Sequence, residues 1–155
     1  MKSILVPLDL SDATTSLLEH AGNFAKALQA KVYLLHVIEP VASYVPVGAS
    51  MDVLAAPAPS QSPDPADVEK RLRHLAETLV NKATQVDIKA VIGLAVEEVL
   101  ASAESDSVDY IVMASHGHGA LYHLFSGSVV TGVLKRAKCP VLVVPASSSA
   151  VVEKP

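Results

Sequence analysis

The sequence predicts an α/β fold: a single domain with a doubly wound, five-stranded, mostly parallel sheet. Five short apolar segments alternate along the chain with longer segments of helical periodicity. Apolar residues at nearly every position indicate strands buried on both faces, which is typical of parallel sheets. The length of 155 residues fits one domain, and strands that alternate with helices imply right-handed crossovers.

The first strand and helix are predicted from residues 4–28. Ile4–Leu8 is too short for a helix, and we place Pro7 at the strand's end because proline cannot donate to a sheet ladder. Ser11 has a side chain that suits a helix N-cap. The helix after it carries apolar residues at helical spacing: Leu17, Leu18, Ala21, Phe24, Ala25 and Leu28. The second strand is Val32–Ile38, which contains His36 as a core or pocket-edge residue.

A proline-rich stretch, residues 39–65, interrupts the regular pattern. Six of the ten prolines lie in it, mixed with alanine and serine. We expect a flexible surface loop within one domain and not a boundary between two domains. General loop behaviour favours a spacer, and the alternative is a lid or a partner-binding segment.

Strands and helices alternate again after this loop. The next helix carries four apolar residues on one stripe: Val68, Leu72, Leu75 and Leu79. The third strand is Asp87–Ile92, closed by Gly93. A short helix follows, marked by Val96, Val99, Leu100 and Ala103. Asp106 and Asp109 look like a solvated turn before the fourth strand, Val108–Met113.

The last predicted helix is Gly127–Ala137, followed by the fifth strand, Cys139–Val144. The helix residues expected to face inward are Val130, Val133, Leu134 and Ala137. Residues 1–146 then form the domain, and residues 147–155 form a disordered tail.

Charge and composition argue against several classes of protein. The net charge is −4 and the pI about 5.8, whereas a nucleic-acid-binding protein should present a basic face. The same balance gives no reason to expect an anionic membrane as a partner. The first apolar run is too short for a signal-peptide core or a membrane span, so we expect a cytoplasmic protein. One cysteine, Cys139, leaves no internal disulfide, and a small buried residue is its default role.

The clearest functional signal lies between Met113 and Val129. A buried strand ends in a loop with two glycines, and Gly127-Ser128 then opens a helix. This order is typical of an anion site, because glycine lets backbone N–H groups approach a phosphate and a helix N-terminus adds positive potential. In open parallel sheets ligands bind beyond the carboxyl ends of strands, where strand order reverses. Asp9 would face the same crevice if the first and fourth strands are neighbours.

Taken together, these pieces resemble the universal stress protein family nearly end to end. The matching segments are Ile4–Asp9 with Ser11, Leu35–Val37, Gly93, Asp109–Met113, Ser115–Gly117, Gly127-Ser128 and Cys139–Val144. The nucleotide-binding branch of the family carries Gly-x2-Gly-x9-Gly-Ser/Thr. This chain has Gly117, the nine-residue gap and Gly127-Ser128, with Ala114 at the first glycine position. Alanine fits there if its φ is negative and is strained if its φ is positive.

The resemblance implies a fold, a ligand and a partner. The fold is of the adenine nucleotide alpha-hydrolase-like type with strand order 3-2-1-4-5, and the partner is a second copy that pairs through the C-terminal strand, Pro140–Val144. The ligand is ATP, ADP or AMP, with Mg²⁺ only through the bound nucleotide. The implied nucleotide-binding residues are Pro7, Leu8, Asp9, Val37, Met113, Ala114, Ser115, His116, Gly117, Gly127, Ser128 and Val129. The function would be a stress-response switch or sensor.

Two alternatives to this function remain open: a slow ATPase, and a protein-interaction module with a vestigial pocket. The sequence has no P-loop motif, and no lysine or arginine lies between Met113 and Val133. Phosphoryl transfer needs cationic stabilisation, so binding is favoured over catalysis and no catalytic residue is assigned. His116, His118 and His123 lack the further ligand spacing of a zinc site, so we expect no metal site.

Overall fold

The computed structural model describes residues 1–40, 63–115 and 129–145. In chain order the elements are β1 (Ser3–Pro7), α1 (Ala13–Leu28), β2 (Lys31–Ile38), α2 (Pro65–Glu77), β3 (Gln85–Ile92), α3 (Ala95–Ser105), β4 (Tyr110–Ser115), α4 (Val129–Arg136) and β5 (Val141–Pro145). The strands form one sheet in the order β3-β2-β1-β4-β5, and each neighbouring pair is parallel. The predicted α/β fold and strand order are confirmed.

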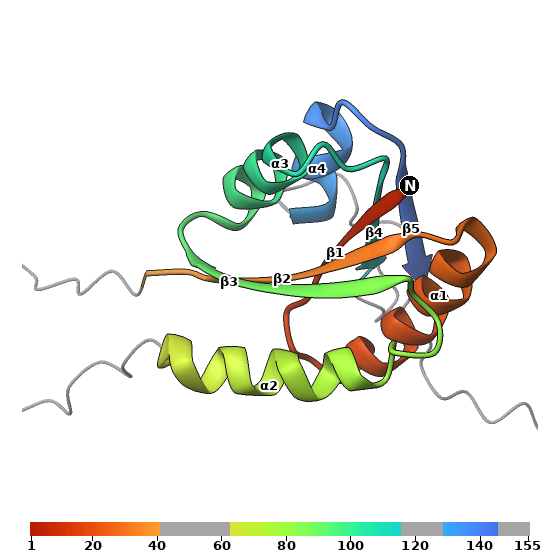
Figure 1. Ribbon diagram of the computed structural model, residues 1–155. Coiled ribbons are helices and arrows are strands. Elements are labelled where there is room, and N and C mark those ends of the chain that lie inside the picture. The colour runs from red at the N-terminus through yellow and green to blue at the C-terminus, as the bar shows by residue number, and fades with distance from the viewer. Residues whose placement is uncertain (41–62, 116–128, 146–155) are drawn as a thin grey trace, which may run out of the picture.

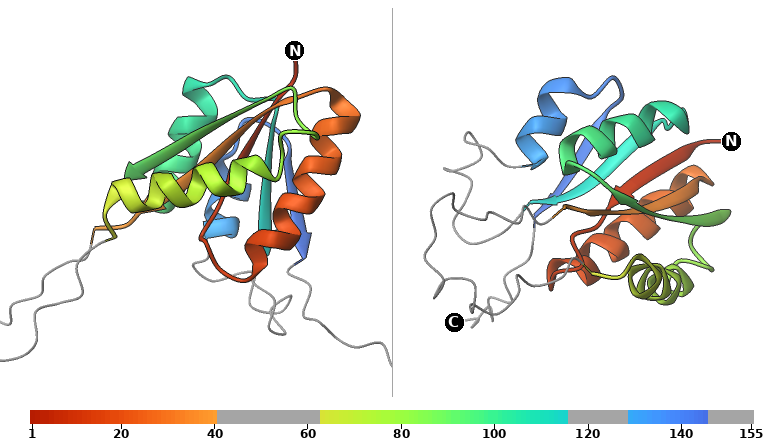
Figure 2. Two further views of the ribbon diagram at one scale, coloured as in Figure 1. Left: turned by 60° about the horizontal axis from the view of Figure 1, so that its bottom comes forward. Right: turned by 90° about the vertical axis from the view of Figure 1, so that its left-hand side faces the viewer.

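Helices cover both faces of the sheet. Helices α1 and α2 lie on one face, with α1 packed against β1 and β4 and α2 packed against β2 and β3 (Figure 1). Helices α3 and α4 lie on the other face and contact each other. The left-hand view in Figure 2 brings α1 and α2 in front of the sheet and leaves α3 and α4 behind it. The sheet is therefore the middle of three layers.

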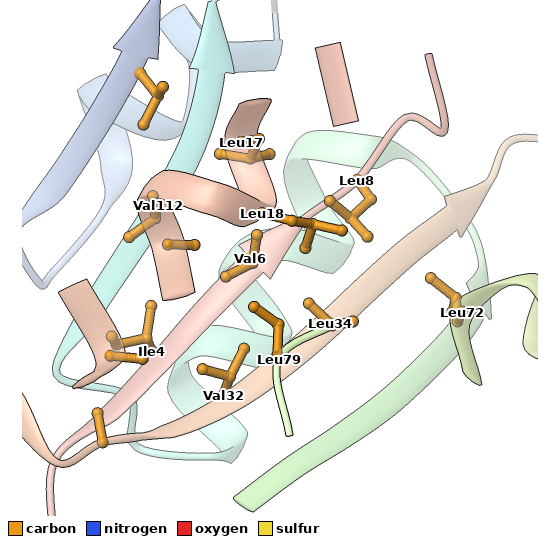
Figure 3. Packing of buried hydrophobic residues seen from close by; sticks show 14 of the residues in the cluster. Ile4, Val6, Leu8, Leu17, Leu18, Val32, Leu34, Leu72, Leu79 and Val112 are labelled. Carbon is orange, nitrogen blue, oxygen red and sulfur yellow. The ribbon is translucent and has the colours of Figure 1, made fainter. Parts of the chain in front are cut away.

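Each face of the sheet has its own core. We call the core under α1 and α2 the first core and the core under α3 and α4 the second core. Along β1, Ile4 and Val6 belong to the first core, whereas Leu5 belongs to the second. All three side chains are fully buried, as the continuous apolar run predicts for a central parallel strand. Figure 3 shows residues of the first core, where Leu17 and Leu18 of α1 pack over β1.

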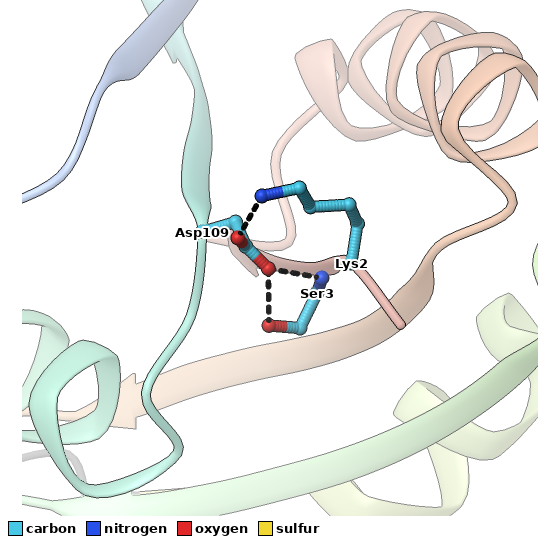
Figure 4. A network of polar contacts seen from close by, with 3 residues as sticks. All are labelled: Lys2, Ser3 and Asp109. Atoms are coloured by element: carbon cyan, nitrogen blue, oxygen red, sulfur yellow. Dashed lines mark hydrogen bonds and ion pairs between the residues drawn. The ribbon is translucent and has the colours of Figure 1, made fainter.

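The strand order reverses between β1 and β4, which are paired in the middle of the sheet. A network at their amino ends holds them together (Figure 4). The Asp109 carboxylate accepts hydrogen bonds from the Ser3 N–H at 2.9 Å and the Ser3 hydroxyl at 3.3 Å, and it pairs with Lys2. The Asp109 N–H in turn donates to the Ser3 carbonyl at 3.0 Å. The expectation of a solvated turn was therefore wrong for Asp109, and Asp106 also forms an ion pair, with Lys89.

Three further differences from the sequence prediction have local causes. Leu134 is 50% exposed and does not face inward, because in α4 the buried positions are Val130, Thr131 and Val133. Leu79 lies beyond the end of α2 but is still buried in the first core. Ser11 does accept the Ala13 N–H at 3.3 Å, although the helix begins one residue later than a Ser11 cap implies.

Several predictions fall on residues outside the described ranges. These are most of the proline-rich loop, the predicted start of the last helix at Gly127, and the tail at residues 147–155. Among the described residues, no helix combines the length and apolar character needed to cross a membrane.

Candidate functional site

A cavity of about 520 Å³ lies at the carboxyl ends of β1, β2 and β4, where the strand order reverses. We call it the switch-point cavity. The residues that line it are Pro7, Leu8, Asp9, Thr14, Leu17, Leu35, His36, Val37, Glu39, Ala95, Val99, Met113, Ala114, Val129 and Val130. Its volume lies in the range typical of small-molecule sites, and its place in the fold is where open parallel sheets bind ligands.

Seven of the predicted nucleotide-binding residues line this cavity, and they come from both halves of the chain. They are Pro7, Leu8, Asp9, Val37, Met113, Ala114 and Val129. Ser115 is the last residue of β4 and is not among the lining residues. The other predicted residues, His116, Gly117, Gly127 and Ser128, lie outside the described ranges, as do His118 and His123.

The loop after β1 is held in place by neighbouring elements. The Leu8 N–H donates to the Leu35 carbonyl at 2.7 Å, and the Leu8 carbonyl accepts from His36 Nδ1 at 2.7 Å. Leu10 has a left-handed φ of 60°, and its carbonyl accepts from Arg71 of α2 at 2.9 Å. These contacts fix the backbone on both sides of Asp9.

Asp9 shapes the same loop through its own carboxylate. Its Oδ1 accepts the Ser11 N–H at 3.0 Å, which is the hydrogen bond of an Asx turn. A carboxylate has four lone-pair sites, so this bond leaves acceptor capacity for a ligand.

His36 is hydrogen-bonded at the wall of the cavity, as expected of a pocket-edge histidine. Because a backbone carbonyl can only accept, Nδ1 must carry the proton in this contact. The bond joins β2 to the residue that follows β1 and so positions Leu8 in the cavity wall.

Ala114 lies within β4, paired in register with Val144 of β5. Among the described residues, the non-glycine positions with positive φ are Leu10, Gln29 and Ser107, and Ala114 is not one of them. The backbone at this position therefore does not require glycine. An alanine at the first glycine position of the motif adds one methyl group without backbone strain.

The acidic side chains in the described wall of the cavity are hydrogen-bond acceptors, and no lysine or arginine accompanies them there. Asp9 and Glu39 contribute carboxylates, and within the described residues no lysine or arginine lines the cavity. The Glu39 carboxylate also accepts the Ala95 N–H at 3.4 Å, at the start of α3, where Leu94 makes no side-chain cap. Such a wall suits a ligand that carries hydroxyl or amino donors.

Sequence reasoning missed Thr14, Glu39 and Ala95 as lining residues. Thr14 lies in the first turn of the helix that follows Asp9, and Ala95 begins the helix that follows Gly93. Helix starts after the carboxyl ends of strands are the signal that could have identified Thr14 and Ala95.

A second and wider cavity, of about 1180 Å³, lies at the opposite end of the sheet. Lys2, Lys26, Lys82 and Thr84 are among its lining residues, and Lys2 is already paired with Asp109. It is an open groove at the amino ends of the strands. We take the smaller cavity as the candidate functional site because it lies where the strand order reverses.

No three His, Cys, Asp or Glu side chains in the described ranges are grouped so as to hold a metal ion. Cys139 is half-buried, and burial raises the pKa of its thiol. A raised pKa lowers the fraction of reactive thiolate, so nothing here indicates a nucleophilic role for this cysteine.

Known proteins of one family match this chain in both sequence and fold. A model of the Universal stress protein family matches residues 1–145. Universal stress protein MJ0531 of Methanocaldococcus jannaschii is 30% identical over 145 residues, which cover 92% of this chain and 81% of that protein. The structure of universal stress protein UspA from Lactobacillus plantarum superposes with a TM-score of 0.69 at 25% identity, covering 92% of this chain and 97% of that one.

A second solved structure is a universal stress protein in complex with cAMP. It has a TM-score of 0.69 and covers 94% of this chain and 98% of its own, at 23% identity. That likeness is one of fold.

Proposed function

Because the chain belongs to the universal stress protein family, we propose that it binds an adenine nucleotide in the switch-point cavity and acts as a nucleotide-dependent switch or sensor in a stress response. The observation that carries the proposal is the convergence of Asp9, Val37 and Met113 on one cavity. Asp9 follows β1, and Val37 and Met113 lie within the last three residues of β2 and β4. A volume of about 520 Å³ suits a ligand of nucleotide size.

The wall matches the two halves of a nucleoside. Leu35, Val99 and Met113 are buried apolar side chains that offer a surface for the base. Asp9 and Glu39 offer acceptors for ribose hydroxyls or for the amino group of adenine. In this proposal Asp9 and the backbone of Val37 contact the adenosine part.

The phosphates would bind where the chain leaves β4 and enters α4. The residues proposed for this part are Ala114, Ser115, His116, Gly117, Gly127, Ser128 and Val129. The ligand is ATP, ADP or AMP, and Mg²⁺ enters only with the nucleotide. The described wall contributes no lysine or arginine, so its side chains give no support to phosphoryl transfer.

The cAMP complex of a universal stress protein with the same fold is in keeping with this class of ligand. At 23% identity that likeness is one of fold, and the cavity of this chain supports the class of ligand.

We also propose a homodimer that forms through β5. This strand is at the edge of the sheet, and its Leu142 is 42% exposed. Leu134 of α4, the helix that precedes β5, is 50% exposed. An apolar edge strand is a template for pairing with a second copy, which would also cover these side chains. The cytoplasmic location predicted from the sequence remains a prediction.

The direct test is isothermal titration of nucleotide-free protein with ATP, ADP and AMP, with GTP as the control for the base. We expect saturable binding of at least one adenine nucleotide in the submillimolar range and weaker binding of GTP. Absence of binding at millimolar adenine nucleotide would contradict the proposal.

A further inference from the structure

Thr14 is a polar residue in the wall of the switch-point cavity that the family motif does not include. It is the second residue of α1, and its side chain is 6% exposed. At helical spacing it shares one face of α1 with Leu17 and Leu18, which both belong to the first core. Thr14 is therefore a hydroxyl placed at the border between a hydrophobic core and a cavity.

The hydroxyl of Thr14 has no hydrogen-bond partner. Among the buried side-chain nitrogen and oxygen atoms of the described residues, Thr14 Oγ1 is the one without a partner. The Ser11 carbonyl accepts the Thr14 N–H at 3.0 Å and the Leu10 carbonyl accepts from Arg71, and neither carbonyl accepts the Thr14 hydroxyl. Buried polar groups are nearly always hydrogen-bonded, so an unpaired one at a cavity wall points to a partner supplied by a ligand.

The position of Thr14 indicates which part of the ligand it meets. Leu8 and Leu17 belong to the core on the α1 side of the sheet, and Ala114 packs against that core, whereas Val99 and Met113 belong to the opposite core. Thr14 is thus on the Ala114 side of the cavity, where the proposed site holds the ribose and phosphates. Threonine in a helix has two accessible χ1 rotamers, so its hydroxyl and methyl group can exchange places at the wall.

We propose that the Thr14 hydroxyl is a nucleotide-binding group that hydrogen-bonds an oxygen of the ribose–phosphate part of the ligand. This inference rests on the proposed function and adds a polar contact from α1, a helix that carries none of the predicted nucleotide-binding residues. The bond is made only in the complex, so the hydroxyl contributes to affinity and contributes nothing favourable to the stability of the nucleotide-free protein.

The test compares Thr14→Val with Thr14→Ser, and uses Thr15→Val as the matched control. Valine keeps the branched shape and removes the hydroxyl, whereas serine keeps the hydroxyl. Thr15 is exposed and is the next residue of the same helix, outside the cavity lining. Each protein is titrated calorimetrically with AMP and with adenosine, and its nucleotide-free melting temperature is measured.

We expect Thr14→Val to weaken AMP binding about tenfold, as the loss of one hydrogen bond implies, while its nucleotide-free melting temperature is unchanged or raised. Thr14→Ser and Thr15→Val should bind AMP like the wild type. An equal loss with adenosine assigns the bond to a ribose oxygen, and a loss confined to AMP assigns it to a phosphate oxygen.

Two results would overturn the inference. One is wild-type AMP affinity in Thr14→Val, and the other is a lowered melting temperature or loss of folding in that variant, which would show that the hydroxyl has a structural partner. If the wild type itself binds no adenine nucleotide, the proposed function is wrong. If the wild type binds and Thr14→Val binds equally well, only the role of Thr14 is wrong.

Discussion

His36 Nδ1 lies 2.7 Å from the carbonyl oxygen of Leu8, and this hydrogen bond joins β2 to the segment that carries Asp9. A side chain near the carboxyl end of β2 thereby fixes the segment that follows β1. Together with the Arg71 contact to Leu10, it makes the geometry of the cavity depend on β2 and α2 as well as on β1.

Replacing His36 should therefore affect both stability and binding. His36→Phe removes the donor and leaves the carbonyl of the buried Leu8 without this bond, which should lower the free energy of unfolding by ~1–2 kcal/mol. We expect weaker nucleotide binding in addition, measured by calorimetry beside urea unfolding. His20→Phe is the control because His20 is exposed on α1. Equal unfolding midpoints for the two variants would contradict the structural role of His36.

Asp9 should be required for nucleotide affinity more than for folding. In Asp9→Asn the amide oxygen can still accept the Ser11 N–H, so the loop is preserved while the negative charge is lost. We expect AMP affinity to fall about tenfold or more, since a hydrogen bond to a charged group is worth ~1.5–3 kcal/mol. Asp12→Asn, an exposed carboxylate outside the cavity lining, should bind AMP normally. The same loss in both variants would indicate a general charge effect.

Gln29 offers a stabilising substitution far from the site. It ends α1 with a left-handed conformation, φ 50° and ψ 46°, and its side chain is exposed. Glycine adopts this conformation without a Cβ penalty, so Gln29→Gly should raise the free energy of unfolding by ~0.5–1 kcal/mol. Ala27→Gly, two residues earlier in the helix, should lower it by a similar amount. Destabilisation by Gln29→Gly in chemical denaturation would refute the prediction.

Asp109 should make stability depend on pH in the acid range. Lys2 and the Ser3 backbone N–H lower the pKa of this carboxyl below its ordinary value of 3.8. A lowered folded-state pKa means that the contribution is present above the unfolded value and is lost as the pH falls through the folded value. The stability difference between wild type and Asp109→Asn should therefore be largest near neutral pH and shrink below about pH 4.

The comparison requires urea unfolding at pH 7, 5 and 3. In a Lys2→Met background the effect of Asp109→Asn should be smaller, because the first cause of the lowered pKa is gone. A stability difference that stays constant from pH 7 to pH 3 would exclude this role for the Asp109 charge.

The dimer proposal leads to a test of the β5 edge. Leu142→Glu places a charge on the exposed edge strand and should convert the protein to a monomer in sedimentation velocity. Val80→Glu is the matched control, because Val80 is 65% exposed at the other end of the molecule, in the groove with Lys82. A monomeric wild type, or a dimer that survives Leu142→Glu, would show that β5 is not the interface.

Much of the fold was predictable because it depends on local pattern. Val32–Ile38 is short and apolar at nearly every position, which is typical of a strand buried on both faces. The sequence prediction was wrong where the burial or pairing of a residue depends on parts of the chain that are distant in sequence. Leu134 is exposed because α4 buries Thr131 in its place beside Val130 and Val133, and Asp109 is paired because the chain brings Ser3 beside it from more than a hundred residues away.

The candidate site, like the fold, was predictable from the sequence only in part. The sequence by itself determined the strand–helix alternation, the strand end at Pro7 and the family resemblance that points to Asp9, Val37 and Met113, because these depend on residue type and spacing. Only the tertiary structure decided that Ala114 needs no positive φ, that His36 bonds to Leu8, and that Thr14 has a buried hydroxyl without a partner. Those facts depend on which backbone groups meet across the sheet, and a linear pattern does not encode such distances.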